Sequence, residues 1–473
     1  MRAARPRARL ALVLAALALA IGALVEALSP SGPPPLPLPG IGRPARSGDP
    51  FAYIPSREAD FVARASAGSA HVLFTKSPGG VLATATRVAS FRSLIDAASA
   101  GTGINPDLLE AIVFLESAGR PNAIAGSDPA DASGLTQILA QTGQALLGMH
   151  IDLGRSRKLT AQINTAAALG QEAKVARLER KRAKIDDRFD PRKALAGAVR
   201  YLELARRDLG RWDLAVVSYH MGIGNLQNVL ADYDNGRAVP YARLFFDTAP
   251  DQHATAYRLL SSFGDDSSLY YWRVLGAEQI MRLDRSDPSA LQRLSTLQTS
   301  GGSNAEVLHP PDLTPTLADP VAVDLAYSRR TILPLPSNVH KLGLEYDPAI
   351  GSLAHKLGFR PGLYRGLRAP ALDLLIELAA RVRTLSGGVG PLVVTSAVSD
   401  RRYQQLEGID DPPAAAGWSF TIARRYVKET QAVAFQSMLD RLQALDLIAW
   451  QRYPSEIEVT VASDAGQAIV NGP

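Results

Sequence analysis

The chain has 473 residues, of which 46% are hydrophobic and 21% charged, and its formal net charge is +5. This composition is typical of a globular protein, excludes a wholly disordered or membrane-embedded chain, and leaves enough length for two or three cores. Four arginines in the first nine residues supply much of the net charge, which argues against a nucleic-acid-binding protein. No cysteine occurs, so disulfides, thiolate chemistry and Cys-based metal sites are excluded.

Residues 1–27 begin with a cationic segment and continue with an apolar stretch from Leu10 to Val25. This pattern predicts a signal peptide or a signal-anchor, with the rest of the chain outside the cytoplasm. Whether the leader is cleaved stays open. Residues 28–50 are rich in proline and glycine and predict an extended linker. We therefore expect an exported protein of the periplasm or cell envelope, free or held at the membrane only by its N-terminal segment.

A mainly helical domain is predicted over residues 51–281, with an inserted helical segment near 150–188. Its early stretch "HVLFTKSPGGVLAT" (71–84) predicts a strand–turn–strand. A second linker is expected at 282–320. Residues 321–473 predict a smaller α+β accessory domain. Its expected elements are a helix near 370–382, a strand in "PLVVTSA", a helix near 428–445 and a final strand in "EIEVTVA".

One helix of the first domain places a carboxylate in an unusual position. Asn105 is a good N-cap and Pro106 suits the first helical position, whereas Gly119 should cap the end, so the helix should run to about residue 118. On it, Leu109 and Ile112 precede Glu116 by seven and four residues and share its face. An apolar surround would raise the pKa of Glu116, as a general acid requires. The alternative is a carboxylate that bends into solvent.

The motifs that follow Glu116 have a recognisable order. They are "ESAG" (116–119), "GLTQI" (134–138), "DP…G…YL" (190–202), "SYHMG" (218–222) and "DSSLY" (266–270). This series resembles the catalytic domain of soluble-type lytic transglycosylases, a lysozyme-like family that cleaves bacterial peptidoglycan, and the resemblance covers roughly residues 90–281. Each motif is weak alone, but their order is specific.

The resemblance implies cleavage of the MurNAc-β-1,4-GlcNAc bond with formation of a 1,6-anhydro-MurNAc end. Glu116 would act as both acid and base, and no cofactor or metal is implied. The resemblance also suggests substrate-binding positions, although packing alone could explain some of them: Ser117, Gln137, Tyr219, His220 and Tyr270, with Tyr271 beside it as an alternative.

The sequence also departs from the family pattern. Thr136 replaces the usual methionine and His220 the usual asparagine. These changes keep a second hypothesis open, a catalytically silent protein that binds the cell wall. The insertion at 150–188 is longer than the family norm and would either wall the cleft or offer a docking surface. Its basic run is interleaved with acidic residues, which favours a solvated helix face.

A hydrolase of the muramidase type is the alternative within enzymes, because hydrolases usually need a second carboxyl group. The candidates are Asp128 and Asp131, although aspartates in such a loop commonly cap turns. The seven histidines show no paired spacing, so no metal site is expected.

The last domain loosely resembles D-Ala-D-Ala carboxypeptidase-like zinc peptidases. Aligned on that pattern, the metal-ligand positions carry Ala414, Thr421 and Val459, while Glu456 matches the general base. No histidine follows His355, so an imidazole-based zinc site cannot form there. We expect a non-catalytic domain that binds peptide stems or a protein partner, whereas glycan strands are the expected partner of the helical domain.

Overall fold

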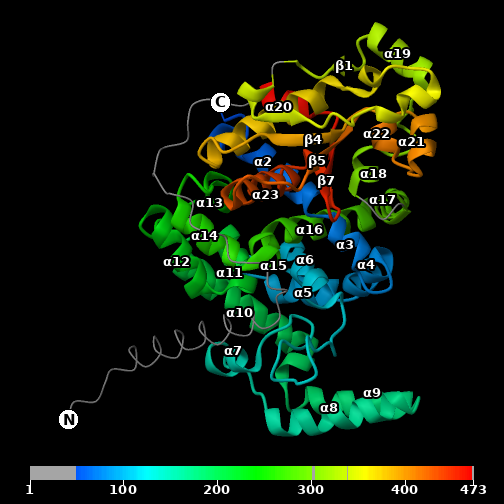
Figure 1. Ribbon diagram of the computed structural model, residues 1–473. Helices are drawn as coiled ribbons and strands as arrows, with labels where there is room; N and C mark the ends of the chain where they lie inside the picture. The colour runs from blue at the N-terminus through cyan, green and yellow to red at the C-terminus, as the bar shows by residue number, and fades with distance from the viewer. Residues whose placement is uncertain (1–48, 301–303, 338, 471–473) are drawn as a thin grey trace. The chain divides into compact units, whose positions relative to one another are not determined.

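The structure is a computed structural model that describes residues 49–300, 304–337 and 339–470 (Figure 1). The predicted leader and nearly all of the first predicted linker lie outside these residues. Within the described ranges, no helix combines the length and apolar character needed to cross a bilayer. The chain forms two compact units. The first contains residues 72–241 and 263–295, and the second contains the described residues before 72, those from 242 to 262, and those from 296 onward.

The first unit is built from helices, as predicted. Helix α6 packs along α16, and α10 packs along α11 and α5. Buried Leu109, Ile112 and Val113 on α6 and buried Trp272 and Val274 on α16 contribute to its core. The main helices are α4 (Val81–Ala89), α5 (Arg92–Ser99), α6 (Pro106–Ser117), α7 (Ala140–Ala145), α8 (Leu153–Ala168), α9 (Glu172–Ala183), α10 (Pro191–Leu209), α11 (Trp212–Met221), α12 (Ile223–Asp234), α15 (Gly264–Ser268) and α16 (Tyr270–Ser286).

Helix α6 begins as the sequence predicts. The Asn105 side chain accepts a hydrogen bond from the Asp107 backbone amide at 3.0 Å, and Pro106 is the first helical residue. Its end differs by one position, because Ala118 rather than Gly119 adopts the first left-handed conformation, with φ of 54°. Gly119 follows with φ of 72° and approaches the Arg87–Val88 backbone so closely that a Cβ would clash there. The helix end is therefore fixed by packing as well as by capping.

The prediction of a strand–turn–strand at 71–84 is wrong. The structure has helices α3 (His71–Thr75) and α4 there, joined by a turn in which Gly79 and Gly80 have positive φ. The turn was placed correctly. The buried residues Val81, Thr84, Ala85 and Val88 recur at helical spacing, which decides for the helix once a core lies beside it.

The second unit contains a five-stranded sheet of order β2-β4-β5-β7-β6, in which only β2 and β4 pair in parallel. Helices α20 (Ala369–Leu385) and α23 (Glu429–Ala444) pack against each other and contact β7 and β6 respectively. The strands are β2 (Leu344–Tyr346), β4 (Leu392–Ser396), β5 (Ser419–Ala423), β6 (Ile448–Arg452) and β7 (Glu456–Val461); short β1 (Leu333–Pro334) and β3 (Gly366–Leu367) pair separately. The expected accessory elements are therefore present.

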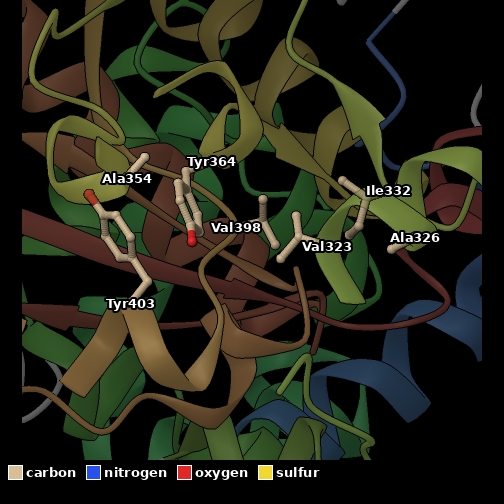
Figure 2. Close-up of a cluster of buried hydrophobic side chains, with 7 residues drawn as sticks. All are labelled: Val323, Ala326, Ile332, Ala354, Tyr364, Val398 and Tyr403. Carbon is tan, nitrogen blue, oxygen red and sulfur yellow. The ribbon is translucent and has the colours of Figure 1, made fainter. Parts of the chain in front are cut away.

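Figure 2 shows a cluster of buried hydrophobic side chains in this unit. Val323 and Ala326 of helix α19 (Pro320–Ser328) contribute to it together with Ile332 and Val398. The Tyr364 and Tyr403 rings lie 4.0 Å apart between centroids, and the Tyr364 hydroxyl donates to Asp400 at 2.6 Å. This cluster packs α19 against residues that follow it in the sequence.

The division into units differs from the predicted domains, which assigned residues 51–281 to one domain. Residues 49–71 and 242–262 belong to the second unit. A buried Asp49–Arg381 ion pair of 2.9 Å and an Arg64–Asp464 ion pair of 2.7 Å hold the early segment there. The predicted linker at 282–320 contains the end of α16, α17 (Pro288–Ser300) and α18 (Asn304–Leu308). These long-range ion pairs leave no local signal in the sequence.

Candidate active site

Glu116 lies in the last turn of α6, where its side chain is half-buried. Its Oε1 accepts a hydrogen bond of 2.6 Å from the Tyr270 hydroxyl at the start of α16. The two residues are 154 positions apart in the sequence, and the packing of α6 along α16 brings them together. The carboxyl predicted from helix periodicity thus has a specific partner among the predicted site residues.

Aromatic rings gather around this pair. The Tyr219 ring stacks on Tyr270 at 6.4 Å with an interplanar angle of 7°, and His220 lies 5.4 Å from Tyr270 between ring centroids. Tyr201 of α10 contacts Tyr219 edge-on at 5.1 Å and donates to the Ser218 carbonyl at 2.5 Å. The sequence places Tyr201 in a motif, but only the fold shows that its ring belongs to this cluster. Four helices therefore converge on Glu116: α6, α10, α11 and α16.

The "GLTQI" loop is fastened to the same cluster. Ser117 donates to the Leu135 carbonyl at 2.8 Å, and Tyr219 donates to the Thr136 carbonyl at 2.8 Å. Gln137 has φ of 47°, and its side-chain amide donates to the Gly134 carbonyl at 2.8 Å. Ser117 and Gln137 therefore make backbone contacts that hold this loop, while Tyr219 links it to the ring cluster.

Burial controls the electrostatics of the site. Removal from water disfavours the carboxylate and raises the pKa of Glu116 to about 7, although the hydrogen bond from Tyr270 partly offsets this rise. The direction is the one that the apolar helix face predicted. Burial also raises the pKa of both Tyr270 and Tyr219 well above the usual value, and Glu116 adds to this rise. Near neutral pH the site therefore holds two neutral phenols and a carboxyl group that can exchange its proton.

The two positions that depart from the family pattern have other partners. The Thr136 hydroxyl is buried and donates to the Ala194 carbonyl at 3.2 Å, so it ties the loop to α10. His220 Nδ1 is 2.9 Å from the Ser267 hydroxyl. Burial lowers the pKa of His220, which favours a neutral ring at pH 7.

The candidate second carboxylates differ from Glu116. Asp128 accepts both the Ala130 backbone amide at 2.8 Å and the Arg157 guanidinium at 2.9 Å. The hydrogen bond from Arg157 is the main cause of the lowered pKa of Asp128, so Asp128 stays charged and paired with Arg157. Asp131 lies in the same loop, and its backbone carbonyl accepts a hydrogen bond from Arg188. Of Glu116 and Asp128, Glu116 is the carboxyl group whose pKa lies near neutrality.

We therefore expect Asp128→Asn to leave the release of soluble fragments from peptidoglycan within about twofold of wild type, because the aspartate caps a turn at the surface. Initial rates with purified peptidoglycan provide the measurement. Asp131→Asn should behave alike. A loss of a hundredfold or more in either variant would favour the hydrolase mechanism.

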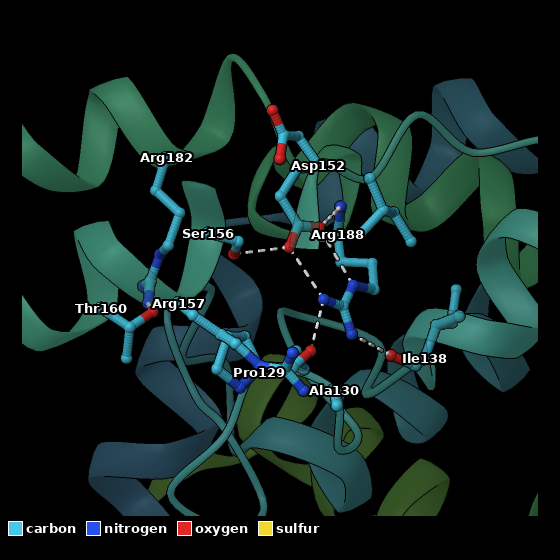
Figure 3. Close-up of polar contacts among 12 residues, drawn as sticks. Pro129, Ala130, Ile138, Asp152, Ser156, Arg157, Thr160, Arg182 and Arg188 are labelled. Atoms are coloured by element: carbon cyan, nitrogen blue, oxygen red, sulfur yellow. Dashed lines mark hydrogen bonds and ion pairs between the residues drawn. The ribbon is translucent and has the colours of Figure 1, made fainter. Parts of the chain in front are cut away.

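A buried ion pair supports the loop from the side of the insertion (Figure 3). Asp186 and Arg188 are both fully buried and lie 2.8 Å apart. The Arg188 guanidinium donates hydrogen bonds to the carbonyls of Pro129, Asp131 and Ile138. The backbone carbonyl of Arg188 occupies the space that a Cβ on Gly134 would need. The loop of residues 129–138 is thus supported by residues that directly follow the inserted helices.

Metal ligands are not grouped in the described part of the chain, where no cluster of three or more suitable side chains occurs. In the second unit, Thr421 is hydrogen-bonded to Ser396 at 2.7 Å and Glu456 accepts from Thr395 at 3.1 Å. Val459 is fully buried, three residues along the same strand from Glu456 and so on the opposite face. The Val459 and Glu456 side chains therefore point to opposite faces of β7.

The first unit is thus an all-helical domain in which one half-buried carboxyl group meets a tyrosine cluster. Residues 93–171 and 161–238 match the Transglycosylase SLT domain family. Residues 93–238 of the helical domain are therefore a lysozyme-like SLT domain, and the family comprises peptidoglycan lytic transglycosylases. The matched residues contain Glu116, Gln137 and Tyr219 but end before Tyr270. No curated protein matches the chain.

Proposed function

We propose that the protein is an exported peptidoglycan lytic transglycosylase that cleaves the MurNAc-β-1,4-GlcNAc bond. The observation that carries the proposal is the Glu116 carboxyl group, with a pKa of about 7 and a 2.6 Å bond from Tyr270. A general acid works best when its pKa lies near the operating pH. The match to the SLT family supports glycan strands as the substrate.

The proposed reaction uses one carboxyl group twice. Protonated Glu116 gives its proton to the glycosidic oxygen as the bond to C1 of MurNAc breaks. The resulting carboxylate then removes the proton of the C6 hydroxyl, whose oxygen attacks C1 and closes the 1,6-anhydro ring. Glu116 ends protonated, as it began, and no water is consumed. The engaged state of Asp128 supports this route over one that needs a second carboxylate.

The neighbouring residues have positioning roles in this proposal. Tyr270 fixes the Glu116 carboxyl group, and Tyr219 holds the "GLTQI" loop while stacking on Tyr270. Ser117 supports the same loop from α6. Gln137 and His220 are proposed to offer polar groups to the sugar. The second unit is proposed to be non-catalytic and to bind peptide stems or a protein partner, and the N-terminal segment to direct export.

The proposed function is tested by digesting purified peptidoglycan and identifying the released muropeptides by mass spectrometry. Anhydro ends, each lighter than a reducing end by one water, are expected. Reducing ends would instead favour the muramidase-type hydrolase. Strong binding without any release would favour the silent cell-wall-binding protein.

Tyr270→Phe should change the pH profile in a definite direction. The lost hydrogen bond stabilises the carboxylate form, so its removal raises the pKa of Glu116 further above about 7. A general acid loses activity as pH rises through its pKa, so the alkaline limb of kcat/KM should move to higher pH while the maximum falls about tenfold. Tyr271→Phe is the matched control, and the alkaline limb of its kcat/KM profile should stay at the wild-type pH. An unshifted limb in Tyr270→Phe would contradict the assigned role.

A further inference from the structure

The inserted segment is a helical hairpin with an internal core of its own. Helices α8 and α9 pack side by side through buried Ile163, Ala166 and Leu178 (Figure 1). The hairpin is fixed to the rest of the unit, because Ser156 of α8 donates to Asp186 at 2.8 Å and Asp186 pairs with buried Arg188 (Figure 3). The hairpin therefore has a fixed orientation relative to the rest of the first unit.

One face of α9, extended by the residue that follows the helix, carries five cationic side chains and no acidic one. Its members occur within about 120° of the helix circumference and over about 15 Å of its length. All five are exposed, and none has an ion pair within the described chain; they are Lys174, Arg177, Arg180, Lys181 and Lys184. We call this set the α9 cationic face. Between residues 153 and 184 nine Lys and Arg side chains stand against two Glu, a larger excess than that of the whole protein.

The acidic residues of this region do not neutralise the α9 cationic face. Asp186 is buried with Arg188, while Glu172 and Glu179 lie on the opposite side of the helix by their spacing. Like charges three and four positions apart on a helix repel each other. The solvated face with alternating charges that the sequence indicated is therefore a one-sign surface, complementary to an extended anion.

The hairpin tip distinguishes a lipid surface from a soluble polyanion. Leu169, between α8 and α9, is 63% exposed and follows the exposed Ala167 and Ala168. The α9 cationic face has no aromatic or amide side chain with which to recognise sugars or peptides. Basic helices with an accessible apolar side chain are suited to the boundary between headgroups and acyl chains of anionic bilayers.

We propose that the α8–α9 hairpin docks on an anionic lipid bilayer, with the α9 cationic face against the headgroups and Leu169 entering the interface. This contact would be a second one, separate from the N-terminal segment, and it does not depend on the activity of Glu116. Each Lys or Arg near an anionic surface strengthens binding about fivefold. A docked hairpin would hold the SLT domain at a fixed distance from the membrane.

The test uses the absence of cysteine from the chain. Ala168→Cys introduces one thiol, which is labelled with a polarity-sensitive dye in the full chain. The protein is reconstituted into vesicles of phosphatidylcholine alone or with one third phosphatidylglycerol. In the anionic vesicles we expect the dye emission to shift to the blue and to be quenched by acyl-brominated lipids. Raising the salt concentration from about 0.05 to about 0.5 M should reverse the shift, because salt screens exposed charges. Neutral vesicles should give neither effect.

Arg177→Glu/Lys181→Glu should weaken docking at least about 25-fold and abolish the shift at moderate salt, without changing the thermal unfolding of the protein. Arg200→Glu/Arg207→Glu makes the same charge change at exposed positions of α10 and should retain the shift. Equal emission in both kinds of vesicle, or a shift that survives Arg177→Glu/Lys181→Glu, would overturn the proposal. A dye response to soluble peptidoglycan fragments that exceeds the response to anionic lipid would overturn it in favour of a wall polymer.

Discussion

Glu116→Gln should reduce the release of muropeptides by at least about a thousandfold, because the amide cannot give a proton to the glycosidic oxygen. Binding to insoluble peptidoglycan should persist, since the side chain keeps its shape and can still accept the bond from Tyr270. The measurement is the initial rate of release beside a pull-down with intact sacculi. Glu203→Gln, on the exposed face of α10, is the matched control and should be fully active. Retention of most activity in Glu116→Gln would contradict the mechanism.

The same substitution should alter stability in a pH-dependent way. Burial raises the pKa of Glu116 from 4.5 to about 7, so the folded state binds this proton more tightly than the unfolded state. The stability that the protonated group contributes is present below pH 4.5 and is lost as pH rises through about 7. The free energy of unfolding of Glu116→Gln should therefore exceed that of wild type at pH 8, by on the order of 2 kcal/mol, and equal it near pH 4. Equal stability at both pH values would show that the carboxyl group is not desolvated.

Arg188→Met should reduce the free energy of unfolding by about 3–5 kcal/mol, because it removes one partner of a fully buried ion pair and leaves Asp186 buried without it. The carbonyls of Pro129, Asp131 and Ile138 also lose their donor, so activity should fall as well. Urea unfolding at pH 7 measures the free energy of unfolding, and peptidoglycan digestion measures the activity.

Two further variants keep this prediction testable if Arg188→Met fails to fold. Arg188→Lys retains the charge but not the planar guanidinium, and should lose less stability. Asp186→Asn/Arg188→Met removes both charges and should recover part of the loss. Arg157→Met breaks an exposed ion pair with Asp128 and should change little. A stability of Arg188→Met equal to that of Arg157→Met would contradict the supporting role of the buried pair.

The parts of the fold that local signals specify could be predicted. Asn105 and Pro106 start α6 where expected, and helix periodicity places Glu116 beside the buried Leu109 and Ile112. The short apolar run around Val81 predicts a strand, but a run of this length fits a helix equally well. The core beside Val81 and Val88 decided the outcome.

The sequence could name candidate residues for the site, but it could not show their contacts. The motif order named Tyr219 and Tyr270, but only the packing of α6 along α16 brings Tyr270 to Glu116. In the insertion, Arg188 and Lys184 look equivalent in the sequence, yet one is fully buried in an ion pair and the other is exposed. A charge pattern cannot distinguish them, because burial is set by residues more than forty positions away, such as Ile138.

In the proposed reaction one carboxyl group both donates and removes a proton, while the sugar supplies its own nucleophile. Digestion of peptidoglycan by the wild-type protein in water enriched in heavy oxygen tests it most directly. We expect muropeptides with anhydro ends that carry no heavy oxygen at C1. Reducing ends labelled at C1 would show that water is the nucleophile and would contradict the proposed reaction.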